Sequence, residues 1–215
     1  MEDLDESNVD VKLALDRFSA SERQWVQIEK EKNKDTTPLV KLNGLRDELH
    51  SWIYPLNFID FETSGMALPF TKGRKPYEQL AFQFSHHIVF EDGSVEHASE
   101  YLNATVGEFP NFSFIRALKK ALEKNNGSIF RYHNHENTIV NSIYMQLLSS
   151  DEEDKEELIS FIKSVSHNTS KSDSKWCGER DMIDLWKVVK DYYYDPYTKG
   201  SSSIKDVLPA VLNSS

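Results

Sequence analysis

The sequence is poor in cysteine and contains no long apolar run. Cys177 is the only cysteine among the 215 residues, so no internal disulfide can form, which fits the reducing cytoplasm. No apolar run approaches the roughly 20 residues that span a bilayer. The acidic segment 1–10 also lacks the apolar centre of a secretory signal. We therefore expect a cytoplasmic protein that has no membrane partner.

Signatures of several enzyme classes are missing as well. The sequence has no G-x-x-x-x-G-K, no G-x-S-x-G and no G-x-G-x-x-G, so it offers no support for an ATPase, a serine hydrolase or a dinucleotide-binding enzyme. Neither H-E-x-x-H nor paired C-x-x-C is present. A zinc hydrolase would have to draw on the scattered candidates His86, His87, His133, His135 and Cys177. Because neighbouring strand residues face opposite ways, His86 and His87 do not readily share one ion, and this alternative is disfavoured.

The charge balance is acidic. The formal net charge is −10 and the sequence pI is about 5.2. An acidic protein binds phosphate backbones poorly in a non-specific way, which counts against a DNA-coating role. It counts less against a nuclease, whose site is itself acidic and needs only a local basic rim.

Hydrophobic residues make up 39% and aromatic residues 12% of the chain, as expected of a globular protein.

Two carboxylates lie one residue apart in an apolar stretch at residues 57–63. Ile59 and Phe61 favour a β-strand, and side chains on a strand alternate between its faces. Asp60 and Glu62 therefore point the same way, with Cα atoms about 6–7 Å apart. We interpret the apolar flanks as a buried strand, in which two like charges repel and lose solvation unless a divalent metal ion offsets them. The alternative is a solvated strand with an incidental D-x-E pattern.

The remaining pattern predicts the element order β-β-β-α-β-α-α-β-α. Residues 56–102 are expected to form three antiparallel strands with the Asp60 strand central in the sheet, and Asp92-Gly93 is a hairpin turn signal. Alternating helices and strands follow, which favours a mixed α/β sheet with helices on its faces. We divide the chain into an acidic tail with a helical extension, 1–53, and a domain, 54–215. The N-terminal helices, at 11–32 and 43–52, are packing elements or contact a protein partner.

The loop that follows the D-x-E strand is basic. Lys72, Arg74 and Lys75 cluster between residues 64 and 76, close in sequence to the two carboxylates. They either contact substrate phosphates or belong to an ordinary solvated loop. Tyr132 is the further candidate for a substrate contact.

The element order, with D-x-E on its first strand, resembles the ribonuclease H-like fold and, more narrowly, the DEDD exonucleases, which include DnaQ-type proofreading nucleases. In that branch a third carboxylate stands at the start of a helix after a later strand. Glu136 occupies that place here, although aspartate is usual. A histidine commonly orients the attacking water in this branch, and His133 and His135 are the candidates. Alternatively, each of these two histidines is a hydrogen-bonded turn residue.

The sequence also resembles a family of bacterial proteins named domain of unknown function 2779. The resemblance runs from about Tyr54 to Leu212 and rests on Y-P-L-N-F-I-D-F-E-T, R-K-P-Y-E-Q, F-Q-F-S, D-L at 184–185 and S-I-K-D-V-L-P at 203–209. The DEDD enzymes carry a fourth carboxylate near the C-terminus, in H-x-x-x-x-D or Y-x-x-x-D, and neither motif stands in a usable place here. Either the chain is C-terminally truncated before that motif or the site is incomplete. Asp184 either substitutes for it or anchors the adjacent strand.

These resemblances imply a metal-dependent nuclease, a 3′–5′ exonuclease that hydrolyses phosphodiester bonds in single-stranded DNA or RNA. Two Mg²⁺ or Mn²⁺ ions would be held by Asp60, Glu62, Glu136 and Asp184, with His135 as a further catalytic residue. The alternative is a catalytically inactive ribonuclease H-like binding module in a nucleic-acid processing or defence protein. The missing fourth carboxylate and the acidic balance favour this alternative.

Overall fold

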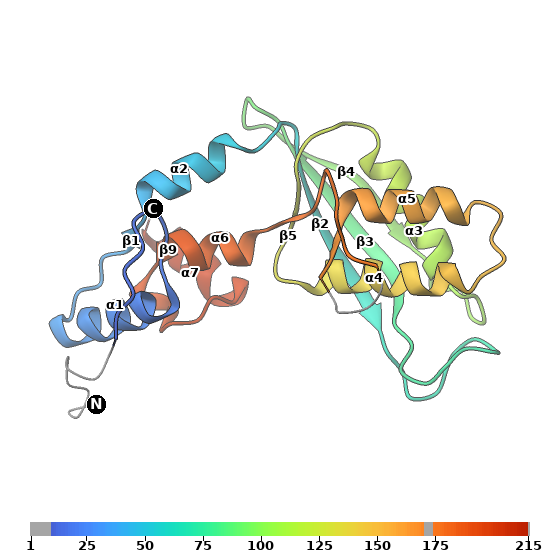
Figure 1. The fold of residues 1–215 in the computed structure, drawn as a ribbon, viewed down its shortest axis with the longest axis horizontal. Coiled ribbons are helices and arrows are strands. Elements are labelled where there is room, and N and C mark those ends of the chain that lie inside the picture. Colours follow the sequence, from blue (N-terminus) through green and yellow to red (C-terminus); the bar gives the residue numbers. More distant parts are fainter. Residues whose placement is uncertain (1–9, 170–173, 215) are drawn as a thin grey trace. The chain divides into compact units, whose positions relative to one another are not determined.

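The structure is a computed structural model that describes residues 10–169 and 174–214 (Figure 1). These residues form two compact units, which divide after Ser51 and after Asp184. One unit comprises residues 52–184. The other combines the segment before Trp52 with the segment from Leu185 onward. This grouping differs from the division into 1–53 and 54–215, because the C-terminal segment packs with the N-terminal helices.

Unit 52–184 is built on a five-stranded mixed sheet with the order β4-β3-β2-β5-β8. The first three strands in the chain form an antiparallel meander: β2 (Leu56–Ser64), β3 (Leu80–Val89) and β4 (Val95–Leu102). On the other side of β2, strands β5 (Ile129–Arg131) and β8 (Ile183–Asp184) run parallel to it and to each other. The predicted meander, its central β2 strand and the mixed α/β sheet are therefore confirmed.

The turn between β3 and β4 is the one that the sequence indicates. Gly93 has a φ of 83°, which a residue with a side chain rarely adopts. The Asp92 carboxylate accepts a hydrogen bond from the Ser94 backbone N–H at 2.9 Å, which closes the turn locally. The hairpin register follows from this short connection.

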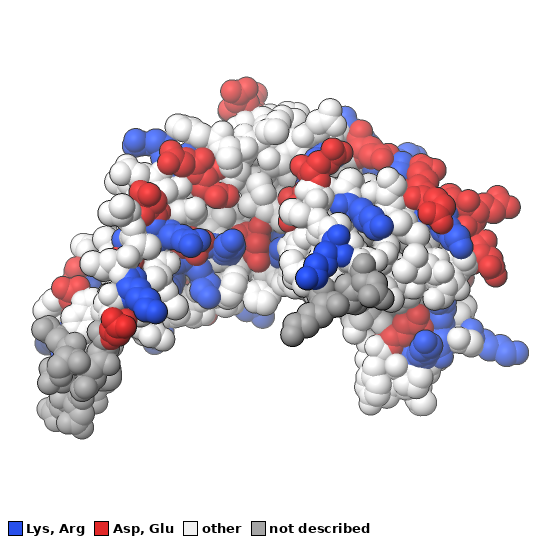
Figure 2. Space-filling model, viewed as in Figure 1, with Lys and Arg blue, Asp and Glu red and all other residues white. Residues whose placement is uncertain are grey.

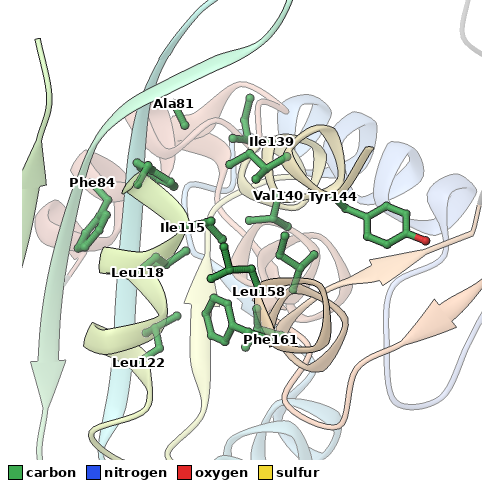
Figure 3. Close-up of a cluster of buried hydrophobic side chains, with 14 of the residues drawn as sticks. Ala81, Phe84, Ile115, Leu118, Leu122, Ile139, Val140, Tyr144, Leu158 and Phe161 are labelled. Carbon is green, nitrogen blue, oxygen red and sulfur yellow. The ribbon is translucent and has the colours of Figure 1, made fainter. Parts of the chain in front are cut away.

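Three helices of this unit pack on one face of the sheet: α3 (Asn111–Leu122), α4 (His135–Leu148) and α5 (Lys155–Val165). Figure 3 shows side chains from β3 and these helices meeting in one buried cluster. Phe114, which has no exposed surface, makes edge-to-face contacts with Phe61 at 4.9 Å and Phe84 at 5.5 Å between ring centroids. The strand residues Ile59 and Phe61 point into this core.

One helix and one strand of this unit are shorter than the sequence pattern predicts. The pattern predicts a helix over 112–126 and a strand over 77–90, whereas α3 ends at Leu122 and β3 begins only at Leu80. The polar run 133–136 is typical of a turn, but α4 already begins at His135. Strands β6 (His167–Asn168) and β7 (Trp176–Cys177) form a small antiparallel pair that the pattern does not predict. The pattern also predicts a loop over 169–175, part of which lies outside the described residues.

The other unit joins the two ends of the sequence. Its N-terminal part consists of α1 (Ala20–Asn33), β1 (Leu39–Val40) and α2 (Leu42–His50). Its C-terminal part consists of α6 (Leu185–Tyr192), β9 (Tyr193–Tyr194), the 3₁₀ helix η2 (Pro196–Thr198) and α7 (Ile204–Ser214). Strands β1 and β9 pair antiparallel, and the Arg23 guanidinium donates to the Tyr193 carbonyl at 2.6 Å. Among the described residues, no helix combines the length and apolar character needed to cross a membrane.

Helix α1 begins later than the predicted start at residue 11, because Ser19 forms a capping box. Its hydroxyl accepts from the Glu22 backbone N–H at 3.1 Å, and the Glu22 carboxylate accepts from the Ser19 backbone N–H at 3.4 Å. Replacing Ser19 with alanine is expected to lower the free energy of unfolding by about 1 kcal/mol. Urea unfolding followed by circular dichroism measures this loss. Ser160→Ala, on an exposed position within α5, is the control, and equal stabilities of the two variants would contradict the capping role.

Candidate functional site

Asp60 and Glu62 lie on the same face of β2, as the strand alternation predicts, but this face is not buried. Both residues are exposed, while Ile59 and Phe61 between and beside them are buried. The interpretation of two desolvated charges on a buried strand is therefore wrong. Helices α3, α4 and α5 cover only the opposite face of β2, the one that carries Ile59 and Phe61. Asp60 and Glu62 therefore remain exposed.

Glu136 is the buried carboxyl of the region. It lies in the first turn of α4, directly after the parallel strand β5, and is 4% exposed. The pKa of Glu136 is raised to about 7, chiefly by burial and in addition by the negative charges of Asp60 and Asp184. A hydrogen bond from its own backbone N–H and the positive charge of Arg131 act in the opposite direction. Its Oε2 atom has no hydrogen-bond partner among the described residues. The Glu136 carboxyl is therefore poised to change protonation near neutral pH.

The three parallel strands explain why Asp60 and Asp184 both act on Glu136. Asp60 lies two residues beyond the Phe58–Phe130 pair that joins β2 to β5. Glu136 follows the end of β5, and Asp184 is the last residue of β8. Because β5 and β8 end level with the middle of β2, where Asp60 lies, the three residues stand near the same end of the two short strands.

Asp184 is held by two groups at the end of β5. Its Oδ2 lies 3.1 Å from Nη1 of Arg131, which is 4% exposed, and its Oδ1 accepts from the His133 backbone N–H at 2.9 Å. Arg131 also donates to the His133 carbonyl. His133 has a φ of 70°, so the chain turns sharply there before α4 begins. These contacts give Asp184 an anchoring role, and its role as a metal ligand stays a prediction.

His135 connects the start of α4 to the end of β2. Its Nε2 lies 3.0 Å from the Thr63 hydroxyl, one residue after Glu62. The side chain is otherwise exposed. The structure therefore brings His135 beside the D-x-E strand, whereas the His133 backbone contacts Asp184 and Arg131.

The predicted substrate contacts differ in their surroundings. Arg74 is half-buried, its Nη1 lies 3.4 Å from the Glu78 carboxylate, and its guanidinium lies 3.3 Å from the centre of the Phe109 ring. It therefore packs against the connection between β4 and α3 and does not point freely into solvent. Lys72 and Lys75 are exposed, and Tyr132 is half-buried at the end of β5. In the face shown in Figure 2, basic and acidic side chains are interspersed.

The carboxylates of this region are suitable ligands for a hard cation, but too few of them lie close together to complete a site. Carboxylate oxygens are the ligands that Mg²⁺ and Mn²⁺ prefer. Glu136 Oε2 has no hydrogen-bond partner among the described residues and is a ligand atom of this type. Within residues 10–169 and 174–214, however, no three His, Cys, Asp or Glu side chains are grouped closely enough to hold an ion. The fit therefore rests on the pair Asp60 and Glu136.

The alternative zinc ligands are also dispersed. Both ring nitrogens of the buried His86 are engaged, Nε2 with the Asn57 amide oxygen and Nδ1 with the Ser99 hydroxyl, each at 3.0 Å. The pKa of His86 is lowered to about 4, chiefly by burial and in addition by the positive charge of Lys124. His86 is therefore a structural core residue.

Sequence reasoning missed Arg131, a buried cation that pairs with Asp184 and lowers the pKa of Glu136. The available signal was a charged residue inside a short strand that is otherwise apolar, since a buried arginine requires an anionic partner. The partner itself, Asp184, lies more than fifty residues away in the sequence, and only the β5–β8 register brings the two together.

The fold and site define an α/β protein with a mixed sheet whose carboxylates gather where its parallel strands end. A family model described as Domain of unknown function (DUF2779) matches residues 57–203, so the chain belongs to this family. The matched region contains Asp60, Glu62, Glu136 and Asp184 and excludes the N-terminal helices. Neither a curated protein nor a solved structure matches the chain.

Proposed function

We propose that this protein is a metal-dependent nuclease with a ribonuclease H-like fold, and that it degrades single-stranded DNA or RNA as a 3′–5′ exonuclease. The observation that carries the proposal is Glu136, a buried carboxyl with a free oxygen that lies under the electrostatic influence of Asp60. The sheet order supports it as well, because an antiparallel meander followed by parallel strands, with D-x-E on the central strand, is the arrangement expected of that fold.

Asp60 and Glu136 would hold Mg²⁺ or Mn²⁺, with Glu62 beside them on β2. A bound ion supplies an activated water and stabilises the charge that develops on the phosphodiester. His135, fixed by Thr63, is suited to orient that water, and the exposed Lys72 and Lys75 are suited to contact phosphates. Arg131 keeps Asp184 and the start of α4 in place.

The test is cleavage of a single-stranded oligonucleotide labelled at its 5′ end, in DNA and RNA form, with Mg²⁺, Mn²⁺ or a chelator. We expect a ladder of products shortened from the 3′ end that appears with metal and disappears with chelator. Asp60→Asn is expected to be inactive and Glu153→Gln, which removes an exposed carboxylate in the turn before α5, to be fully active. Equal cleavage by both variants would contradict the proposed site.

Metal binding also predicts a change in stability. An ion that binds only the folded protein raises its free energy of unfolding by about 2.7 kcal/mol at a hundred times its Kd. Millimolar Mn²⁺ should therefore raise the Tm of the parent protein. Asp60→Asn should abolish this rise while leaving the metal-free Tm nearly unchanged, because Asp60 is exposed. A Mn²⁺ response that persists in Asp60→Asn would place the ion elsewhere.

The second candidate is a binding module without nuclease activity. It is favoured by the engagement of Asp184 with Arg131 and His133, and by the lack of a three-ligand group in the described parts of the chain. Fluorescence polarisation with the same oligonucleotides tests it. Binding without Mn²⁺ stabilisation and without cleavage would favour this candidate over the nuclease.

A further inference from the structure

Two histidines form a pair across the strands of the β3–β4 hairpin. His87 of β3 and His97 of β4 are register partners. Nδ1 of His97 lies 3.1 Å from Nε2 of His87, and the ring centroids are 4.7 Å apart. Both side chains are exposed, so solvent and dissolved ions reach them.

A third residue fixes the orientation of one ring. Nε2 of His97 lies 3.2 Å from the Glu100 carboxylate, on the opposite side of the ring from His87. When Nε2 of an imidazole donates to a carboxylate, the Nδ1 atom keeps its lone pair. Metal-binding histidines commonly have their second nitrogen occupied in this way. Glu100 therefore leaves His97 Nδ1 available as a ligand atom facing His87.

A β-bulge brings these groups to the same face of the sheet. His97 pairs with His87, but His86 pairs with Ser99, so Ala98 is an extra residue in β4. Without the bulge, His97 and Glu100 would point to opposite faces, since strand side chains alternate. With it, Glu100 pairs with Ser85 on the face that carries His87 and His97. Bulges of this kind frequently re-aim side chains next to functional sites.

We propose that His87 and His97 form a two-histidine binding site for a transition-metal ion, Zn²⁺ or Ni²⁺ by its ligand chemistry. Imidazole nitrogens select such ions over Mg²⁺, which prefers oxygen. With metal–nitrogen bonds of about 2.0–2.1 Å, two ligand nitrogens lie about 2.9 Å apart at a right angle and about 3.4 Å apart at the tetrahedral angle. The observed 3.1 Å lies between these values, so the separation of the two nitrogens already suits one ion. Each ring would turn so that its lone pair points at the ion and not at the other nitrogen.

The ion would take the place of the hydrogen that His87 Nε2 donates to His97 Nδ1. His87 would then carry this proton on Nδ1, as the other neutral tautomer, and water would complete the coordination of the ion. Because no group of three potential ligand side chains exists among the described residues, the site is open and exchangeable. It would also fasten β4, which lies at the edge of the sheet, to its neighbour β3. This inference does not depend on the proposed nuclease function, since its ligands and its metal differ from those of the carboxylate site.

The experiment is a calorimetric titration of the full chain with Ni²⁺, repeated with Zn²⁺, in excess Mg²⁺ so that oxygen-ligand sites do not contribute. We expect one saturable ion per chain. His87→Gln and His97→Gln should each lose this binding. Glu100→Gln should weaken it by about 10–100-fold, because that carboxylate only orients a ligand.

His50→Gln, which removes an exposed histidine of α2, is the matched control and should bind Ni²⁺ like the parent. Hydrogen exchange adds an independent measurement, because bound Ni²⁺ should slow exchange of the β4 amides in the parent and not in His97→Gln. Thermal melts without metal establish that each variant is folded. If no saturable binding occurs, or if His87→Gln and His97→Gln bind as tightly as the parent, the pair is a hydrogen-bonded contact only and the inference is wrong.

Discussion

Replacing Arg131 with methionine is expected to lower the free energy of unfolding by about 3–5 kcal/mol, the cost of breaking a buried ion pair from one side. Arg131 is 4% exposed, and its guanidinium joins the Asp184 carboxylate at 3.1 Å and the His133 carbonyl. Methionine fills similar space but leaves the Asp184 charge without its counter-ion. Urea unfolding at neutral pH measures the loss.

Arg116→Met is the matched control. Arg116 pairs with Glu152 and Asp154, but its side chain is 39% exposed, so its removal should cost no more than about 1 kcal/mol. The double variant Arg131→Met/Asp184→Asn should recover part of the loss, because it removes the unpaired charge. Similar losses for Arg131→Met and Arg116→Met would show that burial of the Arg131 pair does not determine its contribution.

The meander could be predicted from the sequence because its determinants are local. Residues between Leu56 and Leu102 alternate in polarity, and Asp92-Gly93 specifies the turn by its own backbone geometry. Each of these signals acts over a few residues, so the three strands, their order and the position of Asp60 in the central strand follow without knowledge of the rest of the chain.

The environment of the carboxylates could not be predicted in the same way. Whether Asp60 and Glu62 are buried depends on which face of the sheet the three helices cover. The first of these helices, α3, begins only at Asn111. The polar run His133–Glu136 also resembles an exposed turn. Only the positive φ of His133 and the immediate start of α4 rotate Glu136 into the interior.

Long-range register explains the remaining omissions. The β1–β9 pair is two residues long and joins segments at opposite ends of the chain, which no local pattern encodes. The extra residue Ala98 in β4 leaves no signature in composition, yet it decides that His97 and Glu100 share a face. His97 therefore did not enter any candidate site, although it lies 3.1 Å from His87.

Replacing Glu136 with glutamine is expected to stabilise the metal-free protein at about pH 8, by up to about 3 kcal/mol. The pKa of Glu136 is about 7 in the folded protein, against an ordinary value of 4.5. Between these values the folded state binds more protons than the unfolded state, so the parent loses stability as the pH rises through this range. At about pH 4 both states are protonated and the variant should match the parent. Urea unfolding at the two pH values measures the difference.

The same substitution should remove metal-dependent activity. A divalent ion favours the ionised form of Glu136, so Mn²⁺ at about pH 8 should restore stability to the parent. Glutamine cannot supply that charge, and Glu136→Gln should show neither the Mn²⁺-induced rise in Tm nor cleavage. Glu153→Gln, an exposed carboxylate, should behave as the parent in every measurement. The combination of higher metal-free stability with lost metal response separates a functional carboxyl from a structural one, because removal of a structural carboxyl lowers stability at both pH values. If Glu136→Gln is destabilised at about pH 8, or still responds to Mn²⁺, Glu136 is not the ligand on which the nuclease proposal depends.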